Sequence, residues 1–161
     1  MNYGISQLSI VPMRSETSDK SEMINQILFG EHFKILEERK KWSRIRLAHD
    51  SYEGWICNKQ LLKISEEDYQ QLDKDISTLT TDILDIISKD QHQPIVIGSI
   101  LPFYKSGHAN INDEMYEFNG LTTPGYVKKE KIIANALIFL NAPYLWGGRS
   151  PLGIDCSGLT Q

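Results

Sequence analysis

Cysteine is scarce in this sequence, which has only Cys57 and Cys156 among its 161 residues. The two lie far apart and do not form the closely spaced pattern of a disulfide framework. No metal site and no cofactor are predicted. A cysteine that serves as a nucleophile must stay free, so if Cys156 has that role, Cys57 is expected to be a structural residue.

Long apolar runs are also missing, and none approaches the length needed to span a membrane. The first residues, Met1-Asn2-Tyr3-Gly4, lack the basic and apolar stretches of a signal peptide. We therefore expect a cytoplasmic protein. The alternative is an exported protein whose signal peptide has been removed.

There is no excess of basic residues, because 17 Lys and Arg stand against 21 Asp and Glu and give a net charge of -4. Nucleic-acid binding requires a clustered basic surface, so nucleic acid is not expected as a partner. The length and the 40% hydrophobic content fit one or two small globular domains.

Residues 1–64 read as short strands separated by turns. Ile5 to Val11 predict an opening extended segment that ends near Pro12, and residues 42–47 alternate between polar and apolar positions with the period of a half-buried strand. A later strand ends in Gly54-Trp55-Ile56, where Trp55 is expected in the core. The pattern indicates a small barrel.

Residues 65–78 predict a helical connector. Ser65 can cap the helix, and Tyr69, Leu72 and Ile76 recur at helical spacing, which predicts one face packed on a neighbour. Residues 79–128 then return to short apolar stretches. Their ending, Pro124 to Val127, resembles the end of the first unit and indicates a second barrel by internal duplication.

From residue 129 to residue 161 the apolar period becomes helical. A single stripe holds Ile132, Ile133, Ala136, Leu137 and Leu140. Pro143 ends that helix, because the residue before a proline avoids the helical region.

Residues 144–158 read Tyr-Leu-Trp-Gly-Gly-Arg-Ser-Pro-Leu-Gly-Ile-Asp-Cys-Ser-Gly. Cys156 stands at a predicted helix start, where unpaired backbone N–H groups favour a thiolate. Such a nucleophile needs a base, usually a histidine. All 4 histidines precede Cys156 in the chain, so the sequence shows half of an active site.

This motif resembles that of the NlpC-type papain-like cysteine peptidases, which act on bacterial cell-wall peptides. The matching positions are Tyr144, Trp146, Gly147, Gly148, Asp155, Cys156, Ser157 and Gly158. The first unit resembles a bacterial SH3-like domain. The expected fold class is mainly β, with two SH3-like barrels followed by the first helices of a truncated α+β papain-like domain.

The resemblance implies roles for the motif residues. Cys156 would attack an amide carbonyl, and Tyr144 would add an oxyanion donor, although packing beside the loop is an equal alternative. Asp155 and Ser157 would bind the substrate peptide, and Trp146 would form an apolar wall. Asp155 has a competing role as a helix cap, and both roles can be true. The family's histidine follows its cysteine on a strand, so the chain ending at Gln161 is expected to be inactive by itself.

Barrels placed before a peptidase resemble the γ-D-glutamyl-L-diamino acid endopeptidases. The implied partner is a murein stem peptide with a free N-terminal L-alanine, and the implied recognition residues are Glu22 for the ammonium and Tyr52 for the pocket wall. Glu31 and Glu53 are rivals to Glu22. The alternative function is a non-catalytic tandem SH3-like module that binds cell-wall peptides. The diamino acid and the oligomeric state stay open.

Overall fold

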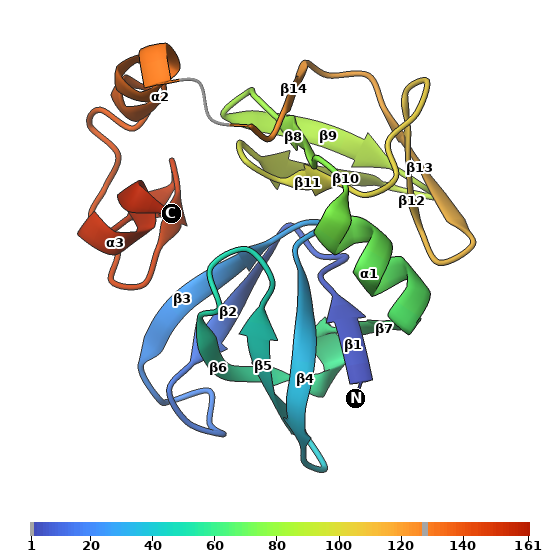
Figure 1. The fold of residues 1–161 in the computed structure, drawn as a ribbon. Helices are drawn as coiled ribbons and strands as arrows, with labels where there is room; N and C mark the ends of the chain where they lie inside the picture. The colour runs from blue at the N-terminus through green and yellow to red at the C-terminus, as the bar shows by residue number, and fades with distance from the viewer. Residues whose placement is uncertain (1, 127–128) are drawn as a thin grey trace.

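The computed structural model describes residues 2–126 and 129–161. Its first unit is a seven-stranded antiparallel sheet with the strand order β3-β2-β6-β5-β4-β1-β7 (Figure 1). The strands are β1 (Asn2–Ile5), β2 (Ile10–Arg14), β3 (Met23–Leu28), β4 (His32–Glu38), β5 (Trp42–Leu47), β6 (Glu53–Cys57) and β7 (Leu62–Ile64), and a 3-10 turn, η1 (Asn58–Gln60), separates the last two.

The alternation in residues 42–47 is confirmed as strand β5. Ser43, Ile45 and Leu47 are buried, whereas the residues between them face outward. Because successive side chains of a strand point to opposite faces, this pattern places one face of β5 on a core. That core contains Val11, Met13, Ile27, Phe33, Ile35, Ile45, Leu47 and Ile56.

Three details of the first unit differ from expectation. Pro12 does not end the opening segment but lies inside β2, opposite Gln26. Strand β2 pairs with β6 at Arg14 and Trp55, away from Pro12, so the flank of β2 toward β6 can accept a residue without an N–H. Strand β3 was not predicted, and Trp55 is only partly buried, with Arg39 lying 4.4 Å above its ring.

Helix α1 (Glu66–Lys74) begins where the sequence predicts. The Ser65 hydroxyl accepts a hydrogen bond from the Asp68 N–H at 3.0 Å, and Tyr69 and Leu72 are buried. Ile76 does not join this packed face. It lies beyond the end of the helix and is 67% exposed, because an extended residue, Asp75, ends the helical spacing before it.

The second strand-rich unit packs above α1 in Figure 1. One of its sheets has the order β10-β9-β13-β12 and the other has the order β11-β8-β14. The strands are β8 (Thr78–Thr80), β9 (Leu84–Ser88), β10 (His92–Val96), β11 (Ile100–Leu101), β12 (His108–Ile111), β13 (Glu114–Phe118) and β14 (Thr122–Pro124). Its core also includes Ile5 and Phe29 of the first unit and Leu72 of α1.

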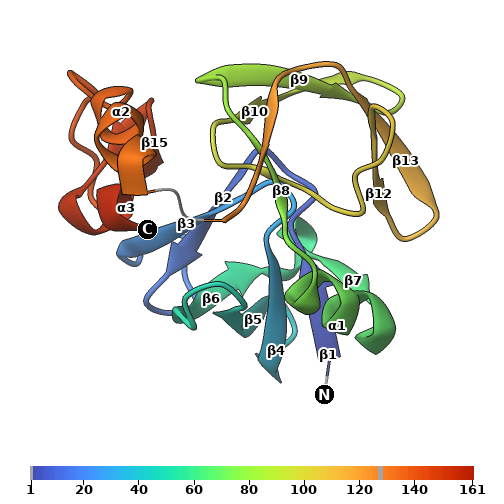
Figure 2. The ribbon, with the colours of Figure 1, turned by 45° about the horizontal axis from the view of Figure 1, so that its top comes forward.

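The C-terminal segment contains η2 (Lys129–Lys131), α2 (Ile132–Leu137), the hairpin β15 (Arg149–Ser150) and β16 (Gly153–Ile154), and α3 (Cys156–Thr160). Figure 2 shows the C-terminal segment on the β3 side of the first barrel. The apolar stripe of α2 is exposed, with Ile133 at 75%. Among the described helices, none has the length and apolar character required to cross a bilayer.

The domain boundaries stay predictions. The one expected after residue 128 adjoins residues 127–128, which lie outside the described part of the chain, as does Val127 of the proposed duplication.

Candidate active site

Cys156 is the first residue of α3, and its thiol is free and exposed. The preceding residue, Asp155, has extended backbone angles and caps the helix. Its Oδ1 accepts the Gly158 N–H at 2.7 Å and the Ser157 hydroxyl, also at 2.7 Å. The cap therefore fixes the turn on which the thiol is carried.

Asp155 also ties the helix start to the glycine loop. Its Oδ2 accepts the Gly147 N–H at 2.8 Å, and the residue is only 8% exposed. Burial alone would raise the pKa of Asp155, but hydrogen bonds from Gly158, Ser157 and Gly147 outweigh burial and lower that pKa. The carboxylate is thus ionised at neutral pH. Its hydrogen bonds to the glycine loop and to the start of α3 fix its position and hold the two segments together.

Two glycines of the motif are required by close approaches. Gly147 has φ +72°, and a Cβ added to it would lie 2.6 Å from the Met23 carbonyl oxygen. A Cβ at Gly158 would lie 2.1 Å from the Gly148 carbonyl oxygen. Gly147 therefore allows the loop to contact the first barrel.

Trp146 of the C-terminal segment contacts Glu22 of the first barrel. The indole N–H donates to Glu22 Oε1 at 2.7 Å, and the Trp146 side chain is 59% exposed. Tyr52 is bound to the neighbouring strand β3, because its hydroxyl donates to the Ile24 carbonyl at 3.3 Å. The structure thus brings Glu22 to the motif and places Tyr52 on the adjoining edge of β3.

Tyr144 is the least constrained of the predicted site residues. It is 69% exposed, and its backbone forms an isolated bridge with Ile154. No described residue hydrogen-bonds to its hydroxyl, so its role as an oxyanion donor stays a prediction.

Arg149 is a site residue that the sequence pattern did not reveal. Its guanidinium binds Glu31 through two hydrogen bonds, Nη1 to Oε2 at 3.0 Å and Nη2 to Oε1 at 2.9 Å. The two side chains are 8% and 5% exposed. No local periodicity marks an arginine inside a glycine-rich loop, and the only available signal was a charge in an otherwise uncharged turn.

The rivals considered for ammonium binding are both occupied. Glu31 is buried against Arg149. Glu53 accepts hydrogen bonds from Arg44 and Arg46 on the outer face of the barrel, and these bonds lower its pKa. Glu22 is the exposed carboxylate that contacts the motif.

Within the described residues no hydrogen bond joins a histidine to Cys156. His49 lies beside the buried pair, with Nε2 3.3 Å from Arg149 Nη2. His32 is buried against Tyr69. The catalytic base is therefore unassigned.

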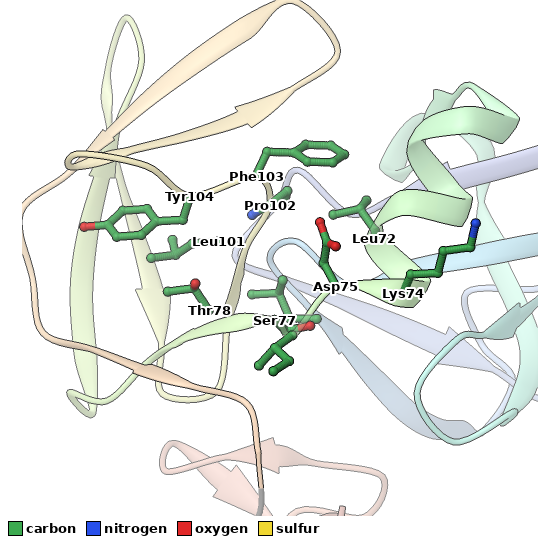
Figure 3. A pocket seen from close by; sticks show the side chains of 11 residues that line it. Leu72, Lys74, Asp75, Ser77, Thr78, Leu101, Pro102, Phe103 and Tyr104 are labelled. Carbon is green, nitrogen blue, oxygen red and sulfur yellow. The ribbon is translucent and has the colours of Figure 1, made fainter.

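A separate hollow lies away from the thiol, between the end of α1 and the second barrel (Figure 3). Its volume is about 460 Å³, and Leu72, Asp75, Phe103 and Tyr104 are among its lining residues. The motif residues are not part of its wall, and Cys156 lies on the exposed surface instead.

Comparison with known proteins places these features in context. Residues 13–61 match the family described as "Bacterial dipeptidyl-peptidase Sh3 domain". The chain is 27% identical to Dipeptidyl-peptidase 6 of Lysinibacillus sphaericus, over 86% of this chain and 60% of that protein. It is 24% identical to the gamma-D-glutamyl-L-lysine dipeptidyl-peptidase of Bacillus cereus, over 89% of this chain and 50% of that protein. The chain thus spans three fifths or less of these relatives.

A solved NlpC/P60 family protein from Bacillus cereus has a similar fold, with a TM-score of 0.77 at 15% identity. The match covers 98% of this chain and 70% of that one. These comparisons confirm the similarity to NlpC-type peptidases with an SH3-like domain. They also confirm a mainly β fold with barrels followed by part of a papain-like domain.

Proposed function

We propose that this chain carries the nucleophile and the substrate-recognition barrel of a cysteine peptidase that cleaves γ-D-glutamyl-diamino acid bonds in murein peptides. One observation carries the proposal. The exposed Cys156 thiol starts α3, and the loop bound to its cap is also bound to Glu22 of the first barrel. The loop thereby links a nucleophile on α3 to a carboxylate for recognition on the first barrel.

The chemistry follows from the position of the thiol. The Cys156 thiolate attacks the carbonyl carbon of the γ-glutamyl amide, and the carbonyl oxygen becomes an oxyanion that the Cys156 backbone N–H at the start of α3 can stabilise. The diamino acid leaves after its nitrogen gains a proton from the base. Water then hydrolyses the thioester, which releases the glutamyl product and restores the thiol.

Glu22 is suited to read a substrate ammonium. Its Oε1 accepts the indole N–H, and no described residue donates to Oε2. An N-terminal ammonium of L-alanine bound there would lie against Trp146, and Tyr52 would add an apolar wall from the β5–β6 turn. The similarity to the γ-D-glutamyl-L-lysine dipeptidyl-peptidase supports this substrate class.

The test is turnover of L-Ala-γ-D-Glu-diaminopimelate by the longest natural chain that contains this sequence. We expect cleavage at the γ-glutamyl bond and complete loss of cleavage in Cys156→Ala. Glu22→Gln should raise KM about tenfold, because one charge-assisted contact is lost. Glu16→Gln, which changes an exposed glutamate of the same turn, should leave KM unchanged.

Calorimetric titration of the tripeptide into the 161-residue chain completes the test. Binding without turnover would favour the non-catalytic recognition module. The absence of both would refute the proposed substrate. An N-acetylated tripeptide that is cleaved equally well would refute the role of Glu22.

A further inference from the structure

We infer that Glu31 and Arg149 form a clamp by which the first barrel positions the nucleophile, so that both are positioning residues and neither binds substrate. The clamp would set where Cys156 stands relative to the recognition residues of the barrel. The inference rests on the proposed function only for its kinetic consequence, because the clamp itself can be tested without substrate.

The contact between the loop and the barrel follows one line. Trp146 binds Glu22, the Gly147 backbone lies against Met23, and the Arg149 N–H donates to Gln26 Oε1 at 2.9 Å. Residues 146–149 therefore run alongside residues 22–26, at the start of β3, in the same chain direction. The first barrel thus determines the course of the loop.

The Arg149 guanidinium closes this line. Besides the two bonds to Glu31, Nη1 donates to the Gln26 carbonyl at 2.8 Å. Glu31 is itself fixed, because its Oε2 accepts the Leu28 N–H at 2.9 Å. A buried, bidentate pair whose carboxylate is held by the backbone has little freedom to shift, and loss of one partner would leave a buried charge unpaired.

The clamp is connected to the nucleophile through a short path of hydrogen bonds. Arg149 pairs with Ile154 in the β15–β16 hairpin, and Ile154 directly precedes the helix cap. The cap is held from the same loop, since the Asp155 N–H donates to the Gly148 carbonyl at 3.2 Å and Oδ2 accepts the Gly147 N–H. Displacing Arg149 would therefore displace Asp155 and the thiol that follows it.

Hydrogen–deuterium exchange of the 161-residue chain tests the clamp. Arg149→Ala and Glu31→Gln should each speed exchange in residues 146–155 by at least about tenfold, because the loop then opens without unfolding the barrels. Arg149→Lys keeps the charge but not the two-pronged geometry, and should give an intermediate rate. The rate at which iodoacetamide alkylates Cys156, measured in a Cys57→Ser background, should follow the same order. It should differ most from the parent's rate in Arg149→Ala and Glu31→Gln, and less in Arg149→Lys.

Glu53→Gln is the matched control, since it removes a carboxylate bound to Arg44 and Arg46 on the same barrel but outside the loop contact. Exchange in strands β4, β5, β9 and β13 reports whether each variant stays folded. An unchanged loop in Arg149→Lys and Glu31→Gln would overturn the clamp. So would an equal effect of Glu53→Gln.

In the longest natural chain, Arg149→Lys and Glu31→Gln should each lower kcat about tenfold, while KM changes less than about threefold. The reason is that Glu22 and Tyr52 stay with the barrel while the thiol is misplaced. Equal changes in kcat and KM would refute a positioning role. If the parent chain neither binds nor cleaves the tripeptide, the proposed function fails, and the exchange data still decide the clamp.

Discussion

Single residues at this site act by accepting or withholding hydrogen bonds. Asp155 receives donors from Gly147, Ser157 and Gly158, and one carboxylate thereby joins a loop to a helix.

His32, which lies on β4 outside the site, is the opposite case. It is 7% exposed, and neither ring nitrogen has a partner among the described residues. Its ring packs edge-on against Tyr69, with the centroids 5.2 Å apart.

Burial lowers the pKa of His32 to about 4, against a weaker opposing effect of Asp73, and His49 adds slightly to the lowering. The unfolded chain, with an ordinary histidine pKa, binds more protons than the folded chain between about pH 6.5 and about pH 4. Stability from this group is therefore fully present above about pH 6.5 and is lost as the pH falls toward about 4.

We expect the free energy of unfolding to fall by about 2 kcal/mol between about pH 7 and about pH 5 through His32. In His32→Leu this loss should disappear, as measured by urea unfolding at the two pH values. His92→Gln, which changes an exposed histidine, should keep the parent's pH dependence. An equal pH dependence in His32→Leu and the parent would contradict the assignment.

Among the structural elements, the contact between loop 146–149 and strand β3 joins the motif to the first barrel. The positive φ of Gly147 is not the full reason why this position needs a glycine. Gly98 also has a positive φ, +82°, but it has room for a side chain, because an added Cβ would lie 3.8 Å from Leu28 Cδ1. The two glycines share a backbone conformation and differ in what surrounds them. Alanine substitutions at the two positions therefore distinguish the cost of backbone strain from the cost of a steric clash.

Gly98→Ala should cost about 1 kcal/mol, the strain of an alanine in the left-handed region. Gly147→Ala should add a clash with the Met23 carbonyl, detach the loop and speed exchange in residues 146–155 at least about tenfold. Mass-spectrometric exchange of both variants would measure this. Equal loop exchange in the two variants would show that docking on β3 does not need a glycine.

Much of this element-level detail could be predicted, and some could not. The Ser65 cap of α1, the alternation in β5 and the start of α3 at Cys156 follow from short-range patterns that hold in any fold. Strand β3 was missed because its pairing partner is β2, and no local alternation marks it. The partner of Glu31 was missed because Arg149 lies 118 residues away in sequence.

Across the whole molecule, one of the two apolar clusters joins the first barrel, α1 and the second barrel. Phe29 of the first unit packs edge-on against Tyr116, with the ring centroids 5.7 Å apart, and its carbonyl accepts the Ile100 N–H at 2.9 Å. Ile5 and Leu72 enter the same cluster. The second barrel is thus completed by side chains of the first and of α1.

Phe29→Ala should cost about 3–5 kcal/mol, because it removes a fully buried ring, and should destabilise both barrels together. Residue-resolved exchange should show lower protection in β9 and β13 as well as in β3. Ile45→Ala, in the first core, should likewise lower protection in β9 and β13. Two separate unfolding transitions in urea would contradict the shared core.

The amino-acid sequence alone accounts for the features that short stretches encode: barrel strands, the two helix caps, and a cysteine placed after an aspartate and a glycine-rich loop. The periods and caps that predict them depend on neighbours within a few residues. Tertiary folding selects which carboxylate meets the motif, which one is buried, and where the loop lies. Glu22, Glu31 and Glu53 are alike in sequence, and only the closure of the barrel against residues 146–149 gives them different partners. A long-range pair forms only when both backbones are already in place, so no local pattern can specify it.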